Sequence, residues 1–200
     1  MKGSLIIVGF FVLGTLCGVC HLLPFDIAET NISYYALCAL MFSVGLSVGN
    51  DPQTLKNFRS LNPRLVFLPI MTILGTLAGS AAVSLILTHR SITDCLAVGS
   101  GFGYYSLSSI FITEYKGAEL GTIALLANIS REILTLLAAP LLVRWFGNLA
   151  PISAGGATTM DTTLPIITRT AGQQFVVVSI FHGFVVDLSV PFLVTLLCSI

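Results

Sequence analysis

Long apolar segments separated by short polar connections make up almost the whole of this chain. Most are long enough to cross a bilayer as helices, which takes about 20 residues. Seven such segments are predicted, at residues 4–23, 33–49, 65–88, 95–113, 120–143, 152–168 and 175–200. The pattern predicts an all-α polytopic membrane protein with about seven transmembrane segments, forming one transmembrane transporter domain over residues 1–200.

Two of these segments are interrupted. The fourth contains Gly-Ser-Gly-Phe-Gly at residues 99–103, and the sixth contains Gly155 and Gly156 between Pro151 and Pro165. Unwound backbone is tolerated at membrane depth only where it is buried in protein or lines a wet cavity. A pair of interrupted segments is typical of transporters built from inverted repeats. Whether the two segments cross the membrane fully or re-enter is left open by the pattern.

Composition agrees with a membrane location. Hydrophobic residues make up 55% of the chain and charged residues 9%, whereas about a quarter of an ordinary soluble domain is charged. The net charge is zero and there is no basic block, so no nucleic-acid partner is expected. The first apolar segment lacks a signal-peptide cleavage site and is predicted to be a retained span.

The basic residues predict an orientation. The loop at residues 50–64 is the most basic connection, so the positive-inside rule makes it cytoplasmic. Seven crossings then give a cytoplasmic N-terminus and an external C-terminus. On this count Lys116 and Arg169 lie inside, and Arg90 and Arg144 lie outside. If only one interrupted segment dips into the membrane, the topology after it inverts.

Acidic residues outnumber basic ones inside the predicted segments. Glu132, Asp161 and Asp187 stand against Arg131, an excess of two negative charges when all are ionised. An acidic cavity attracts cations, and a buried carboxylate can exchange a proton near neutral pH. The charges therefore predict proton-coupled movement of a cation, or of a zwitterion with net positive charge.

Asn128, Arg131 and Glu132 lie on one face of the fifth segment, at positions i, i+3 and i+4. Charged groups at membrane depth need a partner or water. Arg131 and Glu132 could neutralise each other and lock helices together. Neighbouring side chains on a helix point about 100° apart, however, which favours separate partners and a binding role for Glu132.

Other candidate site residues lie at the interruptions and in the last segment. Asp161 is predicted either to cap the broken backbone or to bind substrate. His182 lies on a different face from Asp187 and is predicted to be a hydrogen-bonded core residue. Tyrosine rings and hydroxyl groups at the interruptions could contact a substrate ammonium group. The alternative is that these side chains only pack between helices. The polar candidates at the interruptions are Thr158, Thr159, Tyr104, Tyr105 and Ser106.

Three blocks resemble the signature sequences of the bacterial lysine exporter LysO family. They are Gly-Ser-Gly-Phe-Gly-Tyr-Tyr-Ser-Leu-Ser at 99–108, Ala-Asn-Ile-Ser-Arg-Glu-Ile at 127–133, and the stretch 153–166 around Gly155, Gly156 and Asp161. The resemblance implies export of L-lysine and toxic lysine analogues across the bacterial inner membrane, driven by proton exchange. It implies an essential Glu132, no enzymatic activity and no cofactor beyond the proton gradient.

The chain is shorter than long members of that family, which begin with a further block of membrane spans. We therefore expect either a split transporter, with a small membrane protein supplying the missing spans, or a homo-oligomer. Three other interpretations stay open. They are a sodium- or proton-coupled carrier of another cation or small organic solute, a non-transporting membrane subunit, and an intramembrane aspartyl protease using Asp161 and Asp187, which lack a Gly-x-Gly-Asp setting.

Overall fold

The fold was analysed in a computed structural model, which describes residues 13–14, 16–19, 35, 63–87 and 89–200. Contacts between residues divide the chain into two units, Met1–Ser43 and Val44–Ile200. The first two predicted segments lie largely outside the described residues. Residues 63–87 and 89–200 belong to the second unit.

All described elements of this unit are helical, as predicted. Three helices are long and apolar enough to cross a membrane, spanning Leu65–Ser84, Ala118–Phe146 and Gln173–Ser199. The first and the last of these begin with a 3-10 turn. The elements are η2 Pro63–Phe67 with α4 Leu68–Ser84, α7 Ala118–Phe146, and η4 Gln173–Phe175 with α10 Val176–Ser199.

The fourth predicted segment consists of two short helices, α5 Ile92–Gly99 and α6 Tyr105–Lys116. Between them Phe102 and Gly103 adopt left-handed backbone conformations, with φ of 45° and 92°. The predicted interruption is therefore confirmed. The carboxylate of Asp94 lies 3.8 Å from the ammonium group of Lys116, so the start of α5 and the end of α6 meet. Residues 92–116 form a hairpin, called here the first hairpin.

The sixth predicted segment is a second hairpin, residues 150–171, made of α8 Ala150–Gly155, η3 Gly156–Met160 and α9 Leu164–Ala171. Gly156 has a φ of 64°, so the predicted break at this glycine pair is confirmed. Ile152 from the start of α8 belongs to the same buried cluster as Ile167 and Ala171 from α9. The start of α8 and the end of α9 therefore lie at the same end of the second hairpin.

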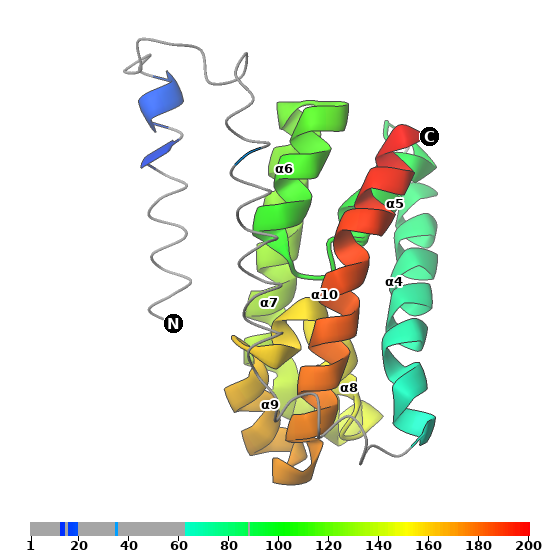
Figure 1. Cartoon of the computed structure of the whole chain (residues 1–200), viewed down its shortest axis with the longest axis vertical. Helices are drawn as coiled ribbons and strands as arrows, with labels where there is room; N and C mark the ends of the chain where they lie inside the picture. The colour runs from blue at the N-terminus through cyan, green and yellow to red at the C-terminus, as the bar shows by residue number, and fades with distance from the viewer. Residues whose placement is uncertain (1–12, 15, 20–34, 36–62, 88) are drawn as a thin grey trace. The chain divides into compact units, whose positions relative to one another are not determined.

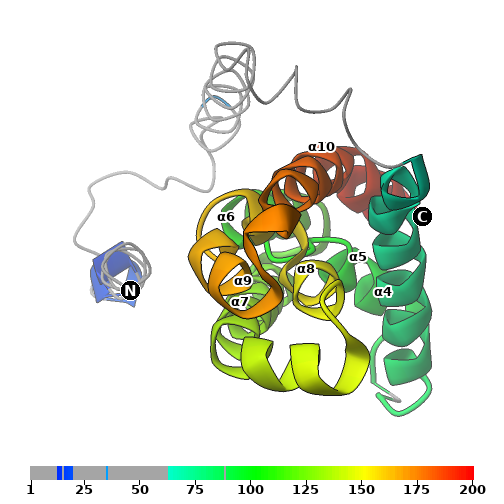
Figure 2. The same cartoon turned by 90° about the horizontal axis from the view of Figure 1, so that it is seen from below.

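The two hairpins occupy opposite ends of the helix bundle (Figure 1). The first hairpin lies in the upper half with the C-terminal end of α10, and the second lies in the lower half. The view along the bundle shows α4 at one edge of the group, beside α5 and α8 (Figure 2). The two interruptions therefore approach each other in the middle of the bundle.

The helices of the interrupted segments are too short to cross a membrane one by one. The helices α5 and α6 have 8 and 12 residues, about 12 and 18 Å at 1.5 Å per residue, which is far short of the roughly 30 Å of a hydrocarbon core. Each interrupted segment turns back instead of continuing. Lys116 contacts Asp94, and Arg90 contacts Glu119 at the start of α7, so Lys116 and Arg90 lie at one end of the bundle. Val143 packs against the buried cluster that contains Ile167 and Ala171, so Arg144 and Arg169 lie at the other end. Seven full crossings would have put the members of each pair on opposite sides.

Candidate functional site

The two interruptions touch through their backbones. The N–H of Ala157 donates a hydrogen bond of 2.9 Å to the carbonyl oxygen of Phe102. A Cβ atom on Gly156 would lie only 2.2 Å from that oxygen, and one on Gly103 would lie 3.2 Å from the carbonyl oxygen of Gly155. Only residues without side chains allow such an approach, which explains the glycines at both breaks.

Asn128 of α7 holds the first break. Its side-chain oxygen accepts a hydrogen bond of 2.7 Å from the N–H of Gly103. Its amide nitrogen donates to the carbonyl oxygens of Ala124 at 2.9 Å and Val98 at 3.3 Å. The residue is 3% exposed, so this amide replaces the helical partners that the unwound backbone has lost.

Arg131, one helical turn further along α7, holds the second break. Its Nε donates to the carbonyl oxygen of Ala154 at 2.8 Å, and its Nη2 donates to that of Ser153 at 3.0 Å. Carbonyls at the end of a helix lack intrahelical partners, and the guanidinium supplies them at the end of α8. The same group lies 5.8 Å from the centre of the Phe102 ring, so it contacts both breaks.

A series of buried side-chain contacts connects the second break to α4. The hydroxyl of Thr159 donates to the carbonyl oxygen of Ser179 at 2.9 Å and lies 3.2 Å from Nδ1 of His182. The other ring nitrogen of His182 lies 2.9 Å from the hydroxyl of Thr72. His182 is fully buried, as expected for a hydrogen-bonded core residue.

A cavity of about 300 Å³ lies beside the two breaks and is called here the polar cavity. Both hairpins, α7 and α10 contribute to its wall. It brings together Glu132, Asp161, Asp187, Tyr104, Tyr105, Ser106 and Thr158 from the predicted site residues, together with Gly103, Ala157, Met160 and Thr162. Asn128, Arg131 and Thr159 do not line it and contact backbone atoms instead.

The polar cavity is acidic. Glu132 and Asp187 are 3% and 5% exposed, and no basic side chain is among the described residues that line the cavity. Asp161 is exposed, and its carboxylate accepts a hydrogen bond of 2.5 Å from the N–H of Thr162. Asp161 thus binds one N–H of the unwound backbone and also lines the cavity, while the N-cap of α9 is Thr163. Within the described residues, no three acidic, histidine or cysteine side chains are grouped as metal ligands.

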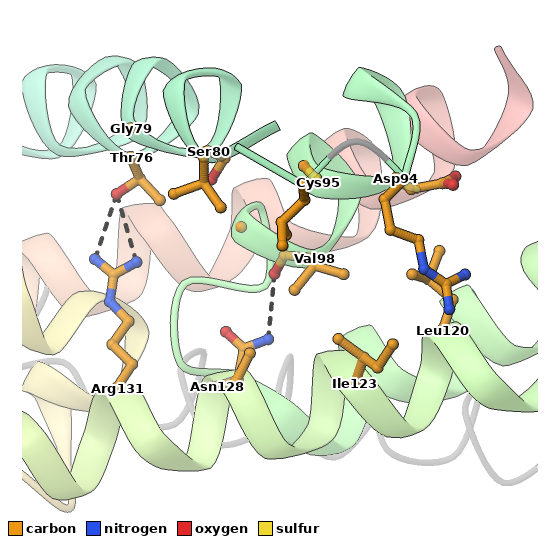
Figure 3. Close-up of a pocket in the computed structure, with 15 residues that line it drawn as sticks. Thr76, Gly79, Ser80, Asp94, Cys95, Val98, Leu120, Ile123, Asn128 and Arg131 are labelled. Carbon is orange, nitrogen blue, oxygen red and sulfur yellow. Dashed lines mark hydrogen bonds between the residues drawn. The ribbon is translucent and has the colours of Figure 1, made fainter. Parts of the chain in front are cut away.

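A second, apolar groove of about 580 Å³ lies between α4, α5 and α7. Its walls are mainly aliphatic, with Val83, Leu87 and Ile123 among them. Figure 3 shows Asn128 and Arg131 projecting from α7 into this groove, toward Val98 of α5 and Thr76 of α4. The two side chains that hold the breaks therefore lie on the side of α7 that faces the groove.

The sequence prediction missed the contribution of α4 to the site. Thr72 contacts His182, and Thr76 lies 3.4 Å from the guanidinium of Arg131. The sequence could have indicated this, because Thr72, Thr76, Ser80 and Ser84 follow one another at four-residue spacing and so form a polar stripe on a mainly apolar helix.

Comparison with known proteins places the chain in a family. The sequence model of a family described as "Lysine exporter LysO" matches residues 8–198. The protein named "Lysine exporter LysO" from Escherichia coli (strain K12) is 37% identical over 191 residues, which cover 96% of this chain and 62% of the relative. A "Putative lysine exporter" from Haemophilus influenzae is 35% identical over 196 residues, covering 98% of this chain and 96% of the relative.

This chain thus spans less than two thirds of the E. coli relative and nearly the whole of the H. influenzae relative. No solved structure matches it. Family members are transporters and not enzymes, and the chain's apolar helices agree with a multi-pass membrane protein. With a family match over almost its whole length, the chain belongs to the lysine exporter LysO family.

Proposed function

We propose that this protein exports L-lysine and cationic lysine analogues across the bacterial inner membrane in exchange for protons, with the polar cavity as the binding site. The observation that supports this most directly is the charge of the cavity. Three carboxylates line it, and no described lining residue is basic. Such a site favours cations over anions, and the names of the relatives point to lysine among the possible cations.

Glu132 is the proposed coupling residue. It is almost fully buried and lines the polar cavity, and it directly follows Arg131, which holds the end of α8. In this mechanism Glu132 binds a proton and the substrate ammonium in turn. Asp161, Thr158 and the tyrosines of the first hairpin contact the remaining polar groups of the substrate.

We also propose an inverted-repeat arrangement. The first hairpin is followed by the long helix α7, and the second hairpin is followed by α10, with the hairpins entering from opposite ends. In transporters of this kind the substrate site lies where the repeats meet. The polar cavity occupies the corresponding place, since both hairpins and both long helices line it.

The proposed orientation keeps the start of α4 in the cytoplasm and the C-terminus outside. Because both interrupted segments turn back, the position of the C-terminus is the same as for seven crossings. Arg144 moves to the cytoplasmic side and Lys116 to the outside. The basic residues thus still favour the cytoplasm, as the positive-inside rule requires.

The test is lysine flux in proteoliposomes under an imposed pH gradient. The chain is reconstituted alone, and then together with any small membrane protein encoded beside it, which we propose as a partner if the chain alone does not form an active homo-oligomer. We expect gradient-driven lysine movement that is lost in Glu132→Gln. The matched control is Glu114→Gln, which changes an exposed glutamate of α6 and should leave flux unchanged.

Normal flux by a well-expressed Glu132→Gln variant would refute the proposed role of Glu132. Flux that depends on a sodium gradient and does not depend on the pH gradient would show sodium coupling instead of proton coupling. No lysine flux by either preparation would refute lysine export and favour the non-transporting subunit.

A further inference from the structure

Asp187 has no protein partner in the part of the chain that the structure describes. It lies in α10, is 5% exposed and lines the polar cavity. No described residue forms a hydrogen bond or an ion pair with its carboxylate. Asp161, by contrast, is held by the N–H and hydroxyl of Thr162. Among the described residues no fully buried side-chain oxygen lacks a partner, so the carboxylate of Asp187 is open to the cavity, where a ligand can bind it.

The N-terminus of α6 gives the same cavity a region of partial positive charge, opposite in sign to the carboxylate of Asp187. This helix has 12 residues, and its N-cap, Tyr104, makes no side-chain capping hydrogen bond. The backbone from Gly103 to Ser106 lines the polar cavity. The first N–H of α6 with a partner inside the helix is that of Ser108, which donates to the carbonyl oxygen of Tyr104. The N–H groups of Gly103 and Tyr104 donate to Asn128 and to the carbonyl oxygen of Gly101. Those of Tyr105 and Ser106 have no partner inside the helix and form the positive end of the helix dipole.

We infer that the polar cavity recognises both ends of a cationic amino acid, with the substrate carboxylate at the N-terminus of α6 and the side-chain ammonium at Asp187. The α-ammonium is then the group that alternates with a proton at Glu132. This inference rests on the proposed function and assigns Asp187 as the residue that determines specificity for a cationic side chain. The cavity volume of about 300 Å³ is at the lower end of the range for small-molecule sites, which suits a single amino acid.

Two analogues of lysine test the two subsites one at a time. Norleucine has the carboxylate and the apolar chain of lysine without the side-chain ammonium. Cadaverine has both amines without the carboxylate. If each subsite contributes, both compounds bind more weakly than lysine, because a site built for a polar group rejects an analogue that lacks it.

The experiment measures binding of lysine, norleucine and cadaverine to the full chain in lipid nanodiscs. We expect the wild-type protein to bind lysine at least about tenfold more tightly than either analogue. Asp187→Asn should reduce lysine affinity by about tenfold or more and leave norleucine affinity unchanged, because only the ammonium contact is lost. Asp187→Glu should restore part of the preference for lysine over norleucine.

The matched control is Asp94→Asn, which removes the partner of Lys116 at the far end of the first hairpin and should leave all three affinities unchanged. Retained norleucine binding also shows that the Asp187 variant is folded. An unchanged lysine preference in Asp187→Asn would overturn the ammonium assignment, and equal binding of cadaverine and lysine would overturn the carboxylate subsite. In either case pH-driven lysine flux by the wild type would leave the proposed function standing, whereas absent lysine binding and absent flux would remove both.

Discussion

The N–H of Ala157 and the carbonyl oxygen of Phe102 are 2.9 Å apart, and this hydrogen bond joins the second hairpin to the first. The two residues belong to hairpins that come from opposite ends of the bundle. The contact lies next to the polar cavity, which Ala157 also lines. The geometry of the cavity therefore depends on how closely the two breaks approach.

The first prediction concerns Gly156. Gly156→Ala should reduce both stability and lysine flux, because the new Cβ atom would lie 2.2 Å from the Phe102 carbonyl oxygen and the φ of 64° is left-handed. Gly147→Ala is a matched control, since Gly147 has a φ of 87° but open space around it. The control should lose only about 1–3 kcal/mol, from backbone strain alone. Thermal unfolding in detergent compares them, and equal losses would show that the close approach does not matter.

The second prediction concerns Asn128. Asn128→Ala leaves the buried N–H of Gly103 without its 2.7 Å partner, which should lower the free energy of unfolding by about 1–3 kcal/mol. Asn128→Asp keeps an acceptor for that N–H but sets a buried carboxylate oxygen against the carbonyl oxygens of Ala124 and Val98, so it should be no more stable than the alanine variant. Asn148→Ala changes an exposed asparagine beyond α7 and should have no effect. A stable Asn128→Ala protein with normal flux would contradict the role of Asn128 at the first break.

The third prediction concerns Arg131. Arg131→Lys keeps the charge but loses the planar group that donates to Ala154 and Ser153 together. Hydrogen bonds to charged groups contribute about 1.5–3 kcal/mol, so local opening should be easier. We expect amide hydrogen exchange over residues 155–160 to rise by about tenfold, which corresponds to about 1.4 kcal/mol. Exchange in the first turn of α7 should not change.

Arg169→Lys is the control for this measurement, because Arg169 is exposed near the end of α9. Equal exchange over residues 155–160 in the wild type and in Arg131→Lys would show that the carbonyls at the end of α8 do not depend on the guanidinium.

The fourth prediction concerns topology. In a cysteine-free background, Asp94→Cys and Lys116→Cys should react with a membrane-impermeant maleimide from the same side of the membrane, because these residues meet at the mouth of the first hairpin. Arg144→Cys and Arg169→Cys should react from the opposite side. Labelling of positions 94 and 116 from different sides would show a full crossing, which is the other alternative that the sequence left open.

The positions of the interruptions could be predicted from the sequence, but their paths could not. Alternate glycines at 99–103 and the pair Gly155–Gly156 indicate unwound backbone whatever the surroundings. The first hairpin, however, has 25 residues from Ile92 to Lys116, and an apolar stretch of that length also suits one crossing. Only contacts distant in sequence, such as Asp94 with Lys116, show that the chain turns back.

The candidate site was predictable to a similar extent. Buried acids are costly in a membrane, so Glu132, Asp161 and Asp187 stood out in the sequence, and the structure brings them to one cavity. Their functional roles stay predictions. Helical spacing showed that Asn128 and Arg131 share a face, but their partners are backbone carbonyls and an N–H of the two breaks. Backbone groups have no sequence signature, so these partners could not be inferred.

The contact between Phe102 and Ala157 also limits how this protein can be recombined with its relatives. Each hairpin presents backbone to the other, with Gly156 against Phe102 and Gly103 against Gly155. A chimera that takes residues 92–116 from one parent and residues 150–171 from another would combine two breaks whose backbones come from different proteins and need not fit each other. Viable crossovers should therefore fall before α5 or after α9, so that both hairpins are inherited from one parent.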